Sequence, residues 1–147
     1  MKIRFVPLDT AFAGALWAED PGQAARWLSL ASSEPQATLG WGVADDERPI
    51  AAFGIRPQWH GRAIAWLAPA PNVRLRHFAA IGAFCIGWFD TLQRNPAFAR
   101  IEGHAPVDQP KHGRWLERMG FEPEALMRRW MPDGGDAMLY ARIAEHA

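Results

Sequence analysis

The feature that most constrains the fold is a long helical pattern, from 74 to 93, that follows three strand-like segments. The segments 36–44, 49–57 and 62–68 are joined by turn-like sequences and predict an antiparallel meander. Apolar residues recur every three or four positions in the helix, so one face is expected in the core. The residues of this predicted core face are Leu75, Phe78, Ala79, Gly82, Cys85, Ile86, Phe89 and Leu92.

Shorter elements come before the meander. Residues 2–8 alternate apolar and polar side chains and predict a strand. Asp9 stands where it can cap a helix, and residues 10–19 and 22–31 each have helical spacing. A strand followed by two short helices is therefore expected at the start of the chain.

The remaining elements follow the long helix. Residues 98–104 predict a fifth strand, and Pro110 opens a helix that runs to Met119 and closes at Gly120. The segments 124–131 and 136–143 then alternate around a turn rich in glycine and aspartate, and predict a hairpin.

Composition limits the partners and the compartment. Lysine plus arginine and aspartate plus glutamate both total 16, so no charge excess attracts nucleic acid or an anionic membrane. Cys85 is the single cysteine, which rules out an internal disulfide and favours a reducing compartment. The longest apolar run, 78–89, is about half of a membrane span, and the start has no apolar signal segment. A single cytoplasmic domain over residues 1–147 is expected.

The order of the elements resembles that of the GNAT superfamily, the Gcn5-related N-acyltransferases. Two local sequences strengthen the likeness: 115–121, which ends in Gly-Phe, and the turn at 133–136. The resemblance implies an α/β (α+β) fold, with a mixed, mostly antiparallel sheet of about seven strands and helices on both faces. It also implies that the fourth and fifth strands splay apart.

The same resemblance implies that the chain binds acetyl-CoA. Residues 74–79 occupy the slot of the family's signature Gln/Arg-x-x-Gly-x-Gly/Ala, in which N–H groups at a helix start hold a pyrophosphate. Arg74 and Ala79 match the signature, and His77 replaces its first glycine. The alternative for the arginines is a solvated helix start. The cofactor residues implied are Leu67, Ala68, Arg74, Leu75, Arg76, His77, Ala79 and Gln109.

Within the superfamily the chain is similar to phage proteins related to the small internal virion protein of short-tailed coliphages. In that group the fourth helix begins with Asn-x-x-His, and this chain has Gln for Asn. This likeness implies a phage or prophage origin and a virion association. The positions that support it are Arg74, Leu75, Ala79, Gln109, His112, Arg114 and Leu116.

Two residues are candidates for acid–base chemistry. Glu102 and His104 alternate onto one face of the fifth strand, where Glu102 is either a base or a solvated residue paired with an arginine. His112 shares a helical face with Leu116 and is expected to point at the sheet, as a core residue or as a catalytic one. No set of histidines and carboxylates has metal-ligand spacing.

The family's usual acid is a tyrosine in the fourth helix, and Leu116 stands at its position. The single tyrosine, Tyr140, is expected in the last strand with its hydroxyl at the surface. Two functions therefore stay open. One is an acyl-CoA-dependent N-acetyltransferase that acts on an unknown amine. The other is a catalytically silent phage structural, ejection or host-interaction protein.

A second apolar row on the long helix suggests a partner. Ile81, Phe84 and Trp88 lie away from the predicted core face, and tryptophan is enriched at interfaces. The row is covered either by other elements of this chain, or by a second copy or a virion component.

Overall fold

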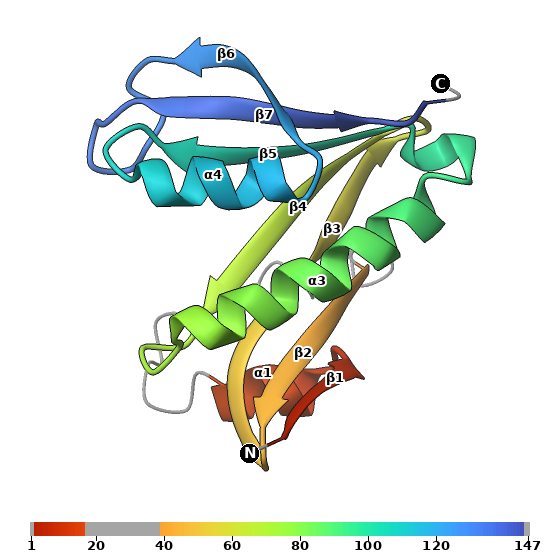
Figure 1. The fold of residues 1–147 in the computed structure, drawn as a ribbon, viewed down its shortest axis with the longest axis vertical. Helices are drawn as coiled ribbons and strands as arrows, with labels where there is room; N and C mark the ends of the chain where they lie inside the picture. Colours follow the sequence, from red (N-terminus) through yellow and green to blue (C-terminus); the bar gives the residue numbers. More distant parts are fainter. Residues whose placement is uncertain (1, 17–38, 146–147) are drawn as a thin grey trace. The chain divides into compact units, whose positions relative to one another are not determined.

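The computed structural model describes residues 2–16 and 39–145. Its described strands form one mixed seven-stranded sheet in the order β1-β2-β3-β4-β5-β7-β6 (Figure 1). The strands are β1 (Ile3–Pro7), β2 (Leu39–Asp45), β3 (Arg48–Trp59), β4 (Arg62–Pro69), β5 (Arg100–Pro106), β6 (Glu122–Met127) and β7 (Ala137–Ile143). The helices are α1 (Thr10–Leu16), α3 (Leu75–Leu92), α4 (Pro110–Arg118) and the short 3₁₀ helix η1 (Pro96–Phe98). The predicted fold class and element order are confirmed, and the predicted helix at 22–31 lies outside the described residues.

The ladder between β4 and β5 is short. These two strands are parallel and pair only from Arg62↔Arg100 to Ile64↔Glu102, whereas β5 pairs with β7 along its whole length. From Gly103 onward, β5 has no ladder partner on the β4 side among the described residues. The predicted separation of the fourth and fifth strands is confirmed.

The chain groups into two compact units. Unit 1 consists of Met1–Arg56 and Trp66–Ile81, and unit 2 consists of Pro57–Ala65 and Gly82–Ala147. The strands β3 and β4 and the helix α3 each contribute residues to both units. The single domain over residues 1–147 stays a prediction.

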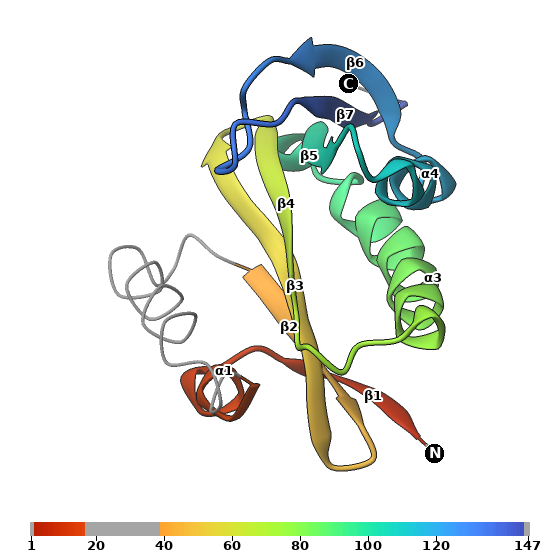
Figure 2. The ribbon, with the colours of Figure 1, turned by 90° about the vertical axis from the view of Figure 1, so that its left-hand side faces the viewer.

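In unit 1, α1 lies on one face of the strands and the start of α3 on the other (Figure 2). Asp9 caps α1 as predicted, because its Oδ1 accepts the N–H of Phe12 at 2.8 Å. The last residue of α1, Leu16, is buried with Ala52 of β3 and Ala70. The apolar end of the helix thereby fixes it to the sheet.

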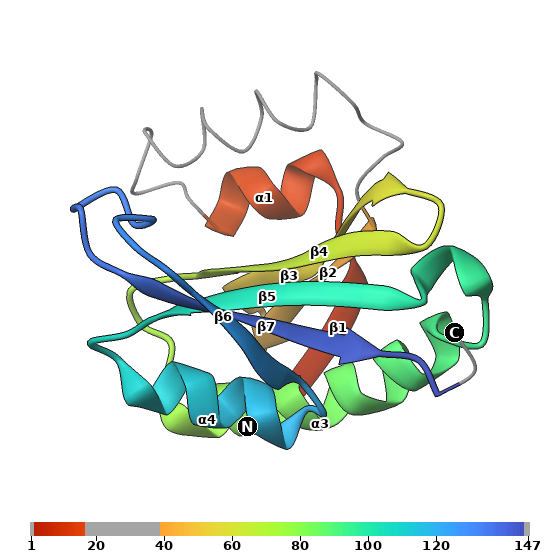
Figure 3. The same ribbon diagram turned by 90° about the horizontal axis from the view of Figure 1, so that it is seen from above.

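In unit 2, α4 and the second half of α3 lie on the same side of the strands (Figure 3). Phe89 of α3 meets Phe121 edge to face, with ring centroids 5.6 Å apart. A methyl group added at Gly103 of β5 would lie 3.3 Å from Leu116 of α4. Aromatic and aliphatic side chains therefore fill the layer between strands and helices.

The predicted core face of α3 is wrong at several positions. Leu75 is 81% exposed and Ile86 39% exposed, although both were expected inside. The buried row instead repeats every four residues, through His77, Ile81, Cys85 and Phe89. The helix is apolar on two sides, so its period alone does not select the inner row. Ile81, which was expected to face outward, therefore belongs to the core.

The prediction for His112 of α4 is also wrong, because His112 is exposed, although Leu116 of the same predicted face is buried. The buried residues of the helix are Gly113 and Leu116. Tyr140 of β7 is 8% exposed, and its hydroxyl, expected at the surface, lies against Gly113, where an added methyl group would be 2.2 Å from it. Because residue 113 is glycine, the Tyr140 side chain can pack against this position of α4. Gly113 therefore faces the sheet, and the neighbouring His112 faces outward.

None of the described helices is both long and apolar enough to cross a bilayer.

Candidate functional site

The start of α3 is fixed by a buried histidine. The N–H of Arg74 donates to Nδ1 of His77 at 2.9 Å, and Nε2 of His77 lies 2.8 Å from Oδ2 of Asp45. Because Nδ1 accepts, the ring proton is on Nε2, and the neutral imidazole donates to Asp45. His77 is 1% exposed, so it joins the helix start to the end of β2.

Asp45 is held as a carboxylate. The hydrogen bond from His77 is the main cause that lowers its pKa, and the nearby charge of Arg76 adds to it. Nη2 of Arg76 donates to Oδ2 of Asp45 at 2.8 Å. The other oxygen, Oδ1, is buried and has no hydrogen-bond partner in the part of the chain that the structure describes.

A pocket of about 370 Å³ opens at the start of α3. It is lined by Asp45, Asp46, Arg48, Ile50, Asn72, Arg74, Arg76 and His77. Within the described residues, the backbone N–H groups of Leu75 and Arg76 have no hydrogen-bond acceptor. The lining carries three guanidinium groups and two carboxylates, which leaves an excess of positive charge. The positive end of the helix dipole adds to this excess, so the pocket is able to hold an anion.

Most of the predicted cofactor residues lie in unit 1. Leu67 and Ala68 are half-buried in β4, and Arg74, Leu75, Arg76 and Ala79 are exposed on or beside the start of α3. His77 lies there as well, but both of its ring nitrogens are already hydrogen-bonded, one to the backbone N–H of Arg74 and the other to Asp45. Gln109 belongs to unit 2, where it is exposed and precedes α4. Their role with a cofactor stays a prediction.

Glu102 is clamped between two arginines in unit 2. Arg62 donates to both carboxylate oxygens, from Nε to Oε1 at 2.7 Å and from Nη2 to Oε2 at 2.8 Å. Nε of Arg100 also donates to Oε1 at 2.7 Å, and the rest of that guanidinium binds Glu124. The sequence left open whether an arginine pairs with Glu102. In the structure two arginines pair with it.

The clamp makes Glu102 a weak base. The hydrogen bond from Arg62 is the largest cause that lowers the pKa of Glu102 to about 2, and Arg100 adds to it. A carboxylate with so low a pKa has little affinity for a proton at neutral pH. Its role as a catalytic base stays a prediction, and so does that of the exposed His112.

His104 lies on the same face of β5 as Glu102 and is exposed. Its ring meets that of Trp130 edge to face, with centroids 6.1 Å apart. The pKa of His104 is lowered, because the surrounding protein removes water that would stabilise the charged ring. Strand alternation placed His104 on this face, but nothing in the sequence indicated its contact with Trp130.

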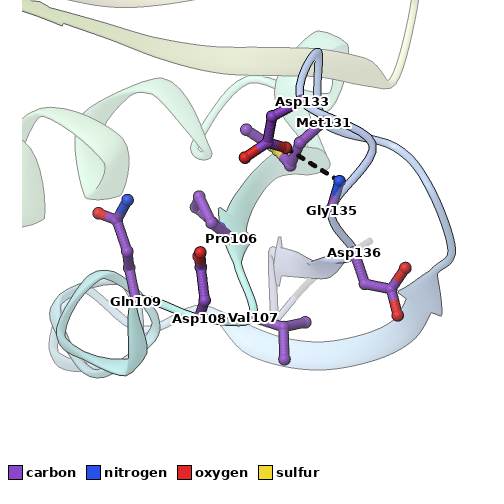
Figure 4. Close-up of a pocket in the computed structure, with 8 residues that line it drawn as sticks. All are labelled: Pro106, Val107, Asp108, Gln109, Met131, Asp133, Gly135 and Asp136. Atoms are coloured by element: carbon purple, nitrogen blue, oxygen red, sulfur yellow. Dashed lines mark hydrogen bonds between the residues drawn. The ribbon is translucent and has the colours of Figure 1, made fainter.

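A second pocket, of about 460 Å³, lies between the start of α4 and the β6–β7 loop (Figure 4). Asp108 lines it beside the start of α4, and Asp133 and Asp136 line it from the β6–β7 loop, with the Asp136 carboxylate turned away from the other two (Figure 4). Oδ1 of Asp133 accepts the N–H of Gly135, and the described residues that line the pocket include no lysine or arginine. Its charge favours a cation over an anion. In the described residues, no group of three or more His, Cys, Asp or Glu residues could hold a metal ion.

Comparison with solved structures finds N-acetyltransferases with the same fold. A chimera of the spermidine N-acetyltransferase SpeG from Vibrio cholerae and hSSAT superposes with a TM-score of 0.75 at 15% identity, and the match covers 99% of this chain and 98% of that one. The ribosomal-protein-S18-alanine N-acetyltransferase from Escherichia coli gives a TM-score of 0.76 at 15% identity, covering 99% and 96%.

No protein-family model and no curated protein sequence matches the chain. At 15% identity the structural likeness establishes the fold of these N-acetyltransferases, and says nothing by itself about the substrate.

Proposed function

We propose that this protein transfers an acetyl group from acetyl-CoA to an amine. The observation on which the proposal depends is the start of α3. Two backbone N–H groups, at Leu75 and Arg76, have no acceptor among the described residues and lie beside the exposed Arg74, on a fold shared with N-acetyltransferases. Backbone donors at a helix start together with a guanidinium are a common arrangement for binding a phosphate.

The residues at this place fit an anionic group. Replacement of the signature's first glycine by His77 adds a side chain, but that side chain is buried against Asp45 instead of standing over the exposed helix start. Leu75 and Ala79 are exposed on the same helix. Arg74 and the N–H groups of Leu75 and Arg76 would hold the phosphates of coenzyme A, which supplies the activated acetyl group when bound.

The first test is binding of acetyl-CoA measured by thermal unfolding. A ligand that binds only the folded state raises Tm, and by mass action it contributes about 2.7 kcal/mol at 100 times its Kd. Arg74→Glu should abolish this rise, because it reverses the charge beside the N–H groups. Arg94→Glu is the matched control, since Arg94 is exposed just beyond the other end of α3, and it should keep the rise.

The second test is transfer of the acetyl group. Spermidine and a peptide that begins with alanine are suitable probe amines, because the two structural neighbours are named for these acceptors. Release of coenzyme A thiol that depends on either amine would support the proposal. No rise in Tm at millimolar acetyl-CoA would overturn it.

A catalytically silent protein is the second candidate. Leu116, at the position of the family's usual acid, is buried against Gly103, so α4 offers no proton donor there. A phage structural, ejection or host-interaction role would suit such a protein, and the phage origin still depends only on the sequence likeness. Binding of acetyl-CoA without transfer to either amine would favour this second candidate.

A further inference from the structure

We propose that Asp45 and His77 are a positioning pair that prepares the start of α3 to bind the phosphates of acetyl-CoA. The inference rests on the proposed function and goes beyond it, because it makes the affinity for acetyl-CoA depend on two side chains that do not contact the ligand. It is based on the hydrogen bonds, burial and charges of residues that all belong to unit 1.

The first argument is the way in which α3 begins. Arg74 directly precedes the helix, at the position where a serine, threonine, aspartate or asparagine side chain usually accepts an N–H of the first turn. A guanidinium accepts no hydrogen bond, so Arg74 leaves these N–H groups open. Among the described residues, the N–H groups of Leu75 and Arg76 have no acceptor. The helix start therefore keeps two donors for an anion.

The second argument is that His77 fixes the geometry of this first turn. Its Nδ1 accepts the N–H of Arg74 at 2.9 Å, and its own N–H donates to the carbonyl oxygen of Arg74 at 3.0 Å. A glutamate or glutamine at the third helical position usually makes the side-chain contact, as half of a capping box. His77 makes it here, and so holds the turn in the conformation in which the N–H groups of Leu75 and Arg76 point out of the helix start.

The third argument is that Asp45 selects the tautomer of His77 that can do this. A carboxylate only accepts hydrogen bonds, so its contact with Nε2 at 2.8 Å places the ring proton there and leaves Nδ1 as an acceptor. The other tautomer would set a ring N–H against the N–H of Arg74. His77 is 1% exposed and the Asp45 side chain 10%, so water competes little with either hydrogen bond.

Asp45 is itself fixed by the sheet. It is the last residue of β2, and it is the ladder partner of Ile3 in β1 and of Arg48 in β3. A backbone held by strands on both sides moves little, so the carboxylate is a fixed point for His77. The sheet thereby sets the position of the first turn of α3.

The same carboxylate also determines which arginine is available to a ligand. Nη2 of Arg76 donates to Oδ2 of Asp45 at 2.8 Å. The guanidinium of Arg74 has no hydrogen bond or ion pair within the described part of the chain, and Arg74 is exposed. The pair therefore withholds Arg76 and leaves Arg74 as the guanidinium that contacts a phosphate.

Calorimetry with the whole protein and acetyl-CoA tests the role of His77. His77→Leu removes the acceptor and should raise Kd about tenfold, the order of one helix-cap interaction. His77→Gln should keep Kd within about twofold of the wild type, because a glutamine oxygen at this position accepts the same N–H. A wild-type Kd in His77→Leu would overturn the inference, and so would an equal weakening in both variants.

Substitution of the two exposed arginines tests the role of Asp45 without changing the core. Arg74→Ala should raise Kd about tenfold or more, because it removes a charge-assisted hydrogen bond to a phosphate. Arg76→Ala should raise Kd clearly less, because Asp45 already binds that guanidinium. Arg94→Ala, beyond the other end of α3, is the control and should keep the wild-type Kd. Equal losses in Arg74→Ala and Arg76→Ala would contradict the proposal.

The imidazole of the wild type decides the matter even if His77→Leu fails to fold. In the ligand-free protein at neutral pH, ¹⁵N NMR should show His77 with a proton on Nε2 and none on Nδ1. A proton on Nδ1 would overturn the inference, because that nitrogen could not accept the N–H of Arg74. A wild type that does not bind acetyl-CoA would instead overturn the proposed function on which the inference rests.

Discussion

At the scale of single residues, the close contact of Gly113 with Tyr140 determines how α4 lies on the sheet. Gly113→Ala would place a methyl carbon 2.2 Å from the Tyr140 hydroxyl oxygen. Overpacking of this kind costs roughly 1–3 kcal/mol, and the higher helix propensity of alanine offsets up to about 1 kcal/mol of that. We expect a lower Tm for Gly113→Ala in thermal unfolding.

Removing the hydroxyl tests the cause. In the double variant Gly113→Ala with Tyr140→Phe the hydroxyl is gone, and the nearest atom of the ring at position 140 to the new methyl group would be Cζ, at 3.1 Å. Most of the lost stability should therefore return. If Gly113→Ala alone is as stable as the wild type, the contact between α4 and β7 is looser than the structure indicates.

At the scale of elements, the chain of ion pairs from Arg62 through Glu102 and Arg100 to Glu124 connects β4, β5 and β6. The pKa of Glu102 falls to about 2 from an ordinary value near 4.5. A group with a lowered folded-state pKa contributes stability above its unfolded pKa, and that contribution is lost as the pH falls through its folded pKa. Wild-type stability should therefore decrease between about pH 4.5 and pH 2.

Glu102→Gln is the variant that tests this ion-pair chain. Breaking a buried pair by removing one partner costs roughly 3–5 kcal/mol, because the other charges stay desolvated. Urea unfolding at pH 7 should show a loss of that order, and the variant should lose less stability than the wild type on acidification. An equal acid dependence in both proteins would show that other carboxylates, such as Asp45, cause it.

At the scale of the whole molecule, assembly through Phe84 and Trp88 stays a prediction, now without Ile81. Trp88 is half-buried and stacks on Phe89 with ring centroids 5.6 Å apart. Trp88→Asp should therefore lower Tm, because stacked aromatic pairs add about 0.5–1.5 kcal/mol beyond burial. If the wild type is an oligomer, the same substitution should also dissociate it to monomer.

Light scattering and thermal unfolding of the same samples separate these effects. Ile86→Asp is the control, because Ile86 is 39% exposed on the same helix and should change Tm little. A wild-type monomer would exclude self-association through this helix. A soluble monomer of Trp88→Asp with wild-type Tm, formed from a wild-type oligomer, would instead show that Trp88 serves the interface alone.

The sequence by itself determined the order of elements and several of their ends. These are local properties: Asp9 bonds to the N–H of Phe12 three residues later, and Gly120 and Gly134 adopt the positive φ that glycine allows at little cost. The likeness in element order then predicted the sheet of seven strands and the separation of β4 from β5.

Only the tertiary structure decided which faces are buried and which site residues are available. His77 and Ile81 are in the core because the start of α3 binds Asp45, and His112 turns outward because Tyr140 fills the space at Gly113. Glu102 is occupied because Arg62 reaches it from a strand that is 40 residues away in sequence. Each outcome depends on contacts between segments that are distant in the sequence. Hydrophobic periodicity and motif spacing are local patterns and contain no information about such contacts.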